Sequence, residues 1–135
     1  MSYPITDIDG IDGNVAAVLK SVGIRSTDRL LEAARTVRGR KALAGKTGFD
    51  EKQFLYWANV ADRMRIKGVR KEYSELLQAA GVDTVKELKY RNPANLAKAM
   101  AEANRKYKKV RLLPSEKVVG RWIDHAKGLP LKITY

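Results

Sequence analysis

The residues best suited to chemistry are basic side chains gathered around a glycine at position 68. Lys67, Gly68, Arg70 and Lys71 lie within the segment IKGVRKE. The glycine permits a tight turn, and the first amides of a following helix carry partial positive charge. Exposed amides beside lysine and arginine side chains suit a phosphate group. We therefore expect phosphate contact here, the alternative being a set of merely solvated charges.

A second basic run occupies residues 105–111, with the sequence RKYKKVR. Its cations could follow a phosphate backbone while the central Tyr107 stacks on a base or packs inward. The alternative is a helix end that runs into a solvated loop. The candidate binding residues of this run are Arg105, Lys106, Lys108, Lys109 and Arg111.

The positive charge is concentrated in two segments. Residues 35–71 carry a net charge of +8 and residues 86–111 a net charge of +7, within a total of +12. The two segments would form one binding face only if they lie side by side. Besides the residues at the turn, the first segment contains the basic residues Arg35, Arg38, Arg40, Lys41, Lys46, Arg63 and Arg65. The alternative to a phosphate contact is that Arg63 and Arg65 complement the carboxyl end of their helix.

Other kinds of site find little support. Asp7, Asp9, Asp12 and Gly13 resemble part of a calcium loop, but position 5 of that loop carries no ligand here, so we expect this acidic stretch to be structural. His125 is the sole histidine, the chain has no cysteine, and no nucleophile is evident that could form a catalytic group with His125. We therefore expect neither an enzyme nor a cofactor or metal.

Hydrophobic periodicity predicts an all-α fold. Apolar residues recur at helical spacing in the segment from Phe54 to Met64 and again from Tyr73 to Ala80. Ser26, Asp50 with Gln53, and Ser115 are typical helix starts, and Thr84 with Glu87 forms a capping-box pattern. The tail alternates like a strand, but five residues alone cannot form a sheet. We predict helices over residues 13–22, 26–36, 38–46, 50–65, 70–80, 84–90, 93–106 and 115–127.

The chain also contains an internal repeat. The segment IDGI at position 8 precedes IKGV at position 66 by 58 residues, and Trp57 precedes Trp122 by 65. We expect both tryptophans to be core residues, and the second copy to have a longer helix or loop between Val85 and Pro114. The repeats should span residues 1–64 and 65–135 and share a single compact domain, because no flexible linker separates them.

The apolar-x-Gly-apolar turn and the helix that follows it, ending at Ala80-Gly81-Val82, resemble the helix-hairpin-helix family. That resemblance implies contact between hairpin amides and the nucleic-acid backbone, without base reading. The family's second hairpin glycine is replaced here by Arg70 and, in the first copy, by Asp12. A monovalent cation held by hairpin carbonyls, as in some members, stays open. Nearly the whole chain also resembles a small bacterial family of uncharacterised domains with two such units.

These observations lead to a function and an alternative. We expect tandem helix-hairpin-helix repeats that bind nucleic acid, DNA in preference to RNA, through phosphates and with little sequence preference. The alternative is an interaction adaptor whose basic surface docks an acidic protein. The large net charge opposes close self-association, so we expect a monomer. No signal peptide or long apolar run is present, so we expect a cytoplasmic protein that does not enter membranes.

Overall fold

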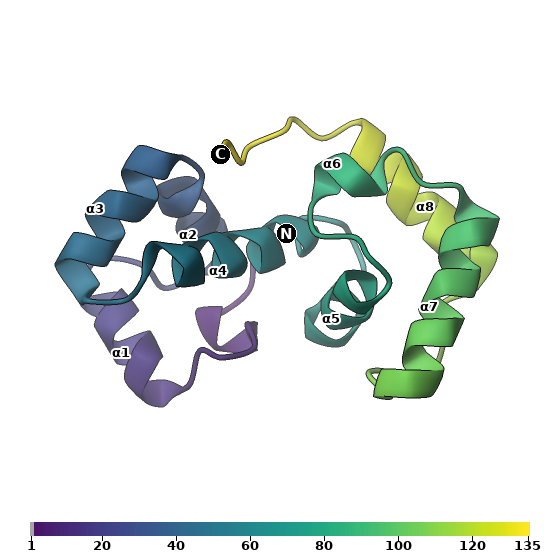
Figure 1. The fold of residues 1–135 in the computed structure, drawn as a ribbon, viewed down its shortest axis with the longest axis horizontal. Helices are drawn as coiled ribbons and strands as arrows, with labels where there is room; N and C mark the ends of the chain where they lie inside the picture. The colour runs from purple at the N-terminus through teal and green to yellow at the C-terminus, as the bar shows by residue number, and fades with distance from the viewer. Residues whose placement is uncertain (1) are drawn as a thin grey trace. The chain divides into compact units, whose positions relative to one another are not determined.

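The computed structural model describes residues 2–135 and confirms the all-α fold (Figure 1). Within those residues no strand forms, and only an isolated antiparallel bridge joins Pro4 to Ser26. All eight predicted helices are present, with ends shifted by a few residues, and a short 3₁₀ helix, η1 (Ile5–Asp7), was not predicted. The α-helices are α1 (Gly13–Ser21), α2 (Thr27–Ala34), α3 (Val37–Thr47), α4 (Glu51–Arg63), α5 (Lys71–Ala79), α6 (Val85–Leu88), α7 (Pro93–Tyr107) and α8 (Glu116–Lys127).

Most helix starts follow the predicted chemistry. The side chain of Ser26 accepts a hydrogen bond from an amide in the first turn of α2, and Ser115 does the same at α8. Asp50 and Gln53 form a full capping box at α4, with the Gln53 side chain accepting from the Asp50 amide at 2.9 Å. These local bonds fix where the helices begin.

The capping box predicted at α6 is wrong. Thr84 occupies the N-cap position, but its side chain accepts no hydrogen bond from the helix backbone. Its hydroxyl donates instead to the carboxylate of Glu87. Because α6 has only four residues, little helix remains for a reciprocal box to stabilise.

The first of two packing units contains η1, α1–α4 and the tail Lys132–Tyr135. Helix α4 is its central element and packs against α2 and α3. Phe54 and Trp57 lie on the buried face of α4 with their rings edge to face, 5.3 Å between centroids. Ile133 of the tail packs against the same core.

The second unit runs from Ile66 to Leu131 and contains α5–α8. Helix α7 packs against both α5 and α8, while α6 packs against α8. Its core includes Leu77, Met100 and Trp122, and the Trp122 ring lies 5.3 Å from that of Tyr73. Each unit therefore buries its own apolar cluster.

The structure confirms the predicted core positions of the two tryptophans. Trp57 and Trp122 are 4% and 3% exposed, each on the buried face of a long helix. The extra residues of the second copy also lie where the repeat predicts, between Val85 and Pro114. Helix α7 has 15 residues against 11 in α3, and residues 108–115 replace the short connection at residues 48–50.

Candidate functional site

The turn at Gly68 places charged and small residues outside and apolar residues inside. Ile66 and Val69 are fully buried, and the Val69 amide donates to the Ile66 carbonyl at 3.0 Å. Lys67 and Gly68 between them are exposed. Gly68 has a φ of 89°, which disfavours other residues. The buried pair thus fixes a turn that presents Lys67 and Gly68 to solvent.

The turn contacts helix α8 through Trp122 and His125. A Cβ atom on Gly68 would lie 3.4 Å from the indole Nε1 of Trp122. One turn further along α8, the Nδ1 atom of His125 accepts a hydrogen bond from the Lys67 amide at 3.1 Å. Sequence reasoning missed this role for His125, because Lys67 and His125 are 58 residues apart and nothing local connects them.

The first turn of α5 has no side-chain cap. Arg70 occupies the N-cap position and makes no capping hydrogen bond, and the first intrahelical bond is donated by the Ser74 amide to the Arg70 carbonyl at 2.8 Å. The amides of residues 71–73 therefore precede the helical bonding pattern. Arg70 and Lys71 are both exposed beside them. This end of α5 combines a positive helix terminus with two cationic side chains.

The turn at Gly10 has the same backbone form and opposite charge. Gly10 also has a φ of 89°, and the Ile11 amide donates to the Ile8 carbonyl at 3.1 Å. The carboxylate of Asp12 accepts from the Val15 amide at 2.9 Å and caps α1. A carboxylate therefore already fills the place where an anion would bind.

The second basic run begins on α7 and continues into an ordered loop. Lys108 ends the helix in the left-handed conformation, with a φ of 50°. The side chain of Asn104 donates to the Val110 carbonyl at 3.0 Å and accepts from the Val110 amide at 2.9 Å. The hydroxyl of Tyr73 donates to the Leu112 carbonyl at 2.9 Å. These bonds hold the loop at Val110 and at Leu112. Tyr107 is 52% exposed and does not pack inward.

A cavity of about 540 Å³ joins this loop to the first turn of α5. Of the predicted residues, Lys108, Lys109 and Arg111 line this cavity together with Glu72 and Tyr73 of α5, and the four candidates around Gly68 do not. Arg105 and Lys106 lie on α7 instead, and Arg105 is paired with Glu102. The other lining residues are Asn104, Val110 and Leu112.

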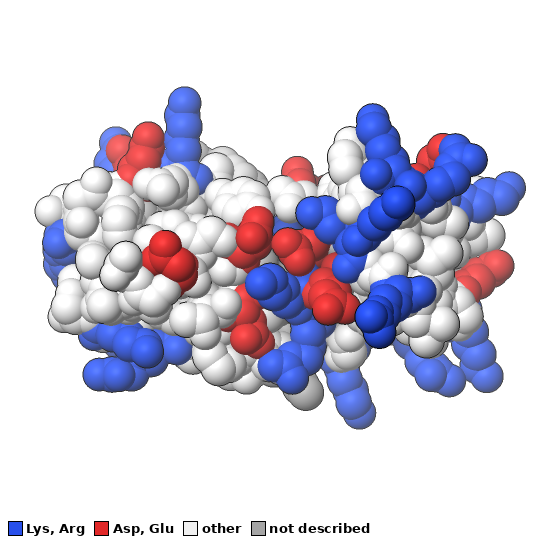
Figure 2. Space-filling view, turned by 90° about the horizontal axis from the view of Figure 1, so that it is seen from below, with Lys and Arg blue, Asp and Glu red and all other residues white. Residues whose placement is uncertain are grey.

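The second unit carries most of the net positive charge. Residues 66–131 carry fifteen basic and seven acidic side chains, a net of +8 out of the total of +12. In Figure 2, lysine and arginine side chains gather over the part of the molecule where α5 and the carboxyl end of α7 lie, with acidic side chains among them. All nine candidate residues are exposed.

Three arginines of the first basic segment are buried and cannot serve an exposed phosphate site. Arg40 is 5% exposed and donates to the carbonyls of Ala34, at 2.9 Å, and Thr134, at 2.7 Å. Arg65 pairs with Asp62 at 2.8 Å, and Arg63 is 1% exposed. Burial in the first unit therefore excludes these three side chains from an exposed basic surface.

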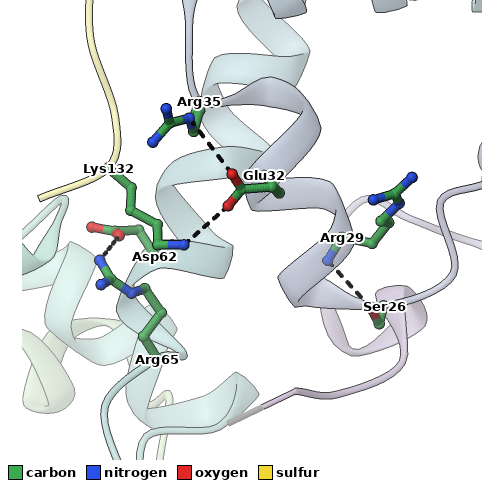
Figure 3. A network of polar contacts seen from close by, with 7 residues as sticks. All are labelled: Ser26, Arg29, Glu32, Arg35, Asp62, Arg65 and Lys132. Atoms are coloured by element: carbon green, nitrogen blue, oxygen red, sulfur yellow. Dashed lines mark hydrogen bonds and ion pairs between the residues drawn. The ribbon is translucent and has the colours of Figure 1, made fainter. Parts of the chain in front are cut away.

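The tail of the first unit is held by exposed charges as well. Figure 3 shows Lys132 donating to Glu32, with Arg35 on the other carboxylate oxygen. The Lys132–Glu32 distance is 3.0 Å. This hydrogen bond from Lys132, its charge, and the nearby Arg35 and Arg29 lower the pKa of Glu32. Glu32 thus favours its charged form in the folded chain.

Residues 2–135 contain neither a cluster of metal ligands nor a membrane-spanning helix. In that part of the chain, no three His, Cys, Asp or Glu side chains gather closely enough to hold a metal ion. In the same residues, no helix has the length and apolar character needed to cross a bilayer.

The fold and its site define an all-helical protein with two glycine-containing turns and a basic surface on the second unit. The chain belongs to the family described as Domain of unknown function (DUF4332), whose match covers residues 9–129. Searches of the curated proteins and of the solved structures each gave no match.

Proposed function

We propose that this chain is a non-catalytic nucleic-acid-binding protein made of tandem helix-hairpin-helix units. It contacts the phosphate backbone of nucleic acid, DNA rather than RNA, with little sequence preference. The protein acts as a monomer and needs no cofactor. The second unit supplies the contacts, through Lys67, Gly68, Arg70, Lys71, Arg105, Lys106, Lys108, Lys109 and Arg111.

The hairpin interpretation is supported by the repetition of one turn geometry. In both turns two buried apolar residues flank an exposed pair, and the glycine has a φ of 89°. In both turns a helix of nine residues follows. Each glycine also lies over a buried tryptophan, Gly10 over Trp57 and Gly68 over Trp122. Such a turn brings backbone amides to the surface next to a helix start, which is what a phosphate contact requires.

The observation that carries the proposal is the uncapped start of α5 among exposed cations. Arg70 leaves the first-turn amides without a side-chain acceptor at the N-cap, and Lys67, Arg70 and Lys71 surround that turn. A backbone phosphate could accept from the amides and neutralise the side chains together. Backbone contacts of this kind carry no base information, so binding should be largely independent of sequence.

The test is a fluorescence polarisation titration of a generic DNA duplex at several salt concentrations, starting near about 50 mM, where phosphate contacts are strongest. The triple variant Lys67→Ala/Arg70→Ala/Lys71→Ala should lower the slope of log affinity against log salt by up to roughly three units, at about 0.9 per lost contact. A matched control, Lys20→Ala/Arg25→Ala/Lys52→Ala, removes three exposed charges from the first unit and should change the slope far less.

A second variant tests whether the first turn takes part in DNA binding. Asp12→Gly removes a carboxylate from the first turn and places there the glycine that the hairpin family favours. Binding should become stronger or stay unchanged. If Asp12→Gly weakened binding as much as the triple variant did, the assignment of the contacts to the second unit would be wrong.

An adaptor that docks an acidic protein is the second candidate. This candidate is favoured by Arg70 and Asp12, which replace the second glycine of the hairpin family in the two turns. Glycine lets the backbone approach a phosphate most closely. A wild-type chain that ignored duplex and single-stranded DNA near about 50 mM salt would contradict the first proposal and favour this one.

A further inference from the structure

We propose that the cavity between α5 and residues 108–112 holds one unpaired nucleotide, so that the protein prefers DNA with a single-stranded gap to a continuous duplex. This inference rests on the proposed function and names its substrate class. It concerns a site that backbone contacts at the hairpin do not require.

The size and lining of the cavity fit a nucleotide. Its volume of about 540 Å³ lies within the usual range of small-molecule pockets, about 300–1,000 Å³. Lys108, Lys109 and Arg111 supply positive charge for a phosphate, while Tyr73 and Leu112 supply apolar surface for the faces of a base. The carboxylate of Glu72 can accept a hydrogen bond from an amino group on a base edge.

The lining is organised before any ligand binds. The paired hydrogen bonds between Asn104 and Val110 fix the middle of the loop, and the bond from Tyr73 to the Leu112 carbonyl fixes its far end. That last bond ties the loop to the first turn of α5, which forms the opposite wall. A site whose walls are already ordered loses less entropy on binding.

The residue at the end of α7 brings a positive charge to this cavity in a backbone conformation that favours glycine. Among residues 2–135, Lys108 is the single non-glycine residue with a positive φ. Helix α3 ends in the same left-handed conformation, but with Gly48, the residue that adopts it most readily. The chain therefore carries a strained lysine where a glycine would fit, and that lysine lines the cavity.

Leu112 gives the cavity an apolar edge among cations. Its side chain is 75% exposed, although it lies in a loop that is held by hydrogen bonds. Some nucleic-acid-binding proteins insert exposed apolar side chains such as leucine between bases, which costs a few kcal/mol per step where the bases are stacked. A continuous duplex keeps its bases stacked inside, whereas a gap offers an unpaired base to this surface.

The experiment compares a continuous DNA duplex with a duplex of equal length that is interrupted by a short single-stranded gap, both by fluorescence polarisation. The wild-type chain should bind the gapped DNA about tenfold more tightly, as expected for one stacked base. Leu112→Ser should reduce that preference, since Tyr73 remains, and leave affinity for the continuous duplex unchanged. Leu113→Ser is the matched control, because Leu113 is adjacent and 41% exposed but does not line the cavity.

A second measurement locates the nucleotide. Titration of the labelled chain with the mononucleotide dAMP should shift the backbone amide resonances of residues 72–73 and 108–112 in NMR spectra, and Leu112→Ser should reduce those shifts. Shifts confined to other residues would overturn the inference.

The outcomes also distinguish this inference from the proposed function. Equal affinity of wild type for the two DNAs, or equal effects of the two leucine variants, would overturn the nucleotide site and leave backbone binding intact. No affinity for either DNA would overturn both proposals. A glutamate-rich peptide that bound in place of DNA, and lost affinity in Leu112→Ser, would reassign the cavity to an acidic protein segment.

Discussion

The turns at Gly10 and Gly68 have the same backbone and opposite chemistry. Both glycines have a φ of 89°, and each turn is anchored by two buried apolar residues. Around the first turn lie Asp9 and Asp12, and at the matching positions of the second lie Lys67 and Arg70. The scaffold is therefore repeated while its surface charge is reversed.

This reversal changes what the following helix can bind. At α1 the Asp12 carboxylate accepts from the Val15 amide, so the helix start is already capped by an anion. At α5 the side chain of the corresponding residue, Arg70, has no hydrogen-bond acceptor and repels no phosphate. One residue at the N-cap thus determines whether a helix start is closed by the chain itself or open to an external anion.

The connection before the last helix of each unit differs as well. In the first unit the short connection at residues 48–50 brings Phe49 against Trp57, edge to face at 5.7 Å. In the second unit residues 108–115 are longer, carry basic side chains and form one wall of the cavity. The residues added in the second copy therefore created a surface that the first copy does not have.

The largest expected effect tests whether the two cores are equivalent. Trp57→Ala and Trp122→Ala should each cost about 3–5 kcal/mol of stability, because each ring is buried beneath a glycine turn. Urea denaturation followed by circular dichroism measures both values. A variant that melted like wild type but lost DNA affinity would show that its tryptophan is a contact residue instead.

Much of this fold could be predicted because its signals are local. Ser26, Asp50 and Ser115 each accept a hydrogen bond from a backbone amide two or three residues further along the chain. The capping side chain and the helix start therefore lie in one short stretch of sequence. The repeat also predicted the buried tryptophans. Thr84 misled the prediction, because the same pattern allows its hydroxyl to bond to Glu87 rather than to serve the backbone.

The parts of the site that could not be predicted depend on distant contacts. Tyr73 bonds to a carbonyl 39 residues away, and the burial of Arg40 depends on Thr134, 94 residues away. Sequence charge alone does not distinguish a buried arginine from an exposed one. The pairing of Asp62 with Arg65 is a partial exception, because residues three apart share one face of a helix.

The next prediction tests whether the turns share their backbone requirement. Gly10→Ala and Gly68→Ala should each cost about 1–2 kcal/mol, because a side chain disfavours a positive φ. The new Cβ atoms would meet the tryptophan nitrogens at 3.7 and 3.4 Å, which is ordinary contact, so the two costs should be similar. Gly45→Ala is the control: Gly45 lies inside α3 with open space around it, so the change should stabilise the chain. Very different costs at the two turns would contradict their equivalence.

A smaller effect tests the reversal at the N-cap. Arg70→Asp should give α5 the cap that Asp12 gives α1 and stabilise the chain by about 1 kcal/mol. DNA affinity should fall, because the carboxylate occupies the amides and one cation is lost. Arg70→Gln is the matched control, since it removes the charge without introducing a carboxylate at the N-cap. If both variants bound DNA equally weakly, the amides would not contribute, and the contrast between the two turns would reduce to side-chain charge.

The smallest effect concerns the exposed ion pair that holds the tail in the first unit. Lys132 and the nearby arginines lower the pKa of Glu32, so the charged carboxylate is favoured in the folded chain. A lowered pKa in the folded state adds stability above the glutamate pKa of the unfolded chain, and this stability is lost as the pH falls through the folded value. Glu32→Gln should therefore lower the thermal midpoint slightly at pH 7, by less than the variants above, because the pair is solvent-exposed. The difference from wild type should disappear as the pH falls through the lowered pKa of Glu32 in the folded chain. A double-mutant cycle with Lys132→Met measures the pairing itself. A difference that persisted in acid would show that Glu32 stabilises the chain through packing rather than through its charge. The buried hydrogen bonds from Arg40 would then contribute more to holding the tail than the exposed ion pair does.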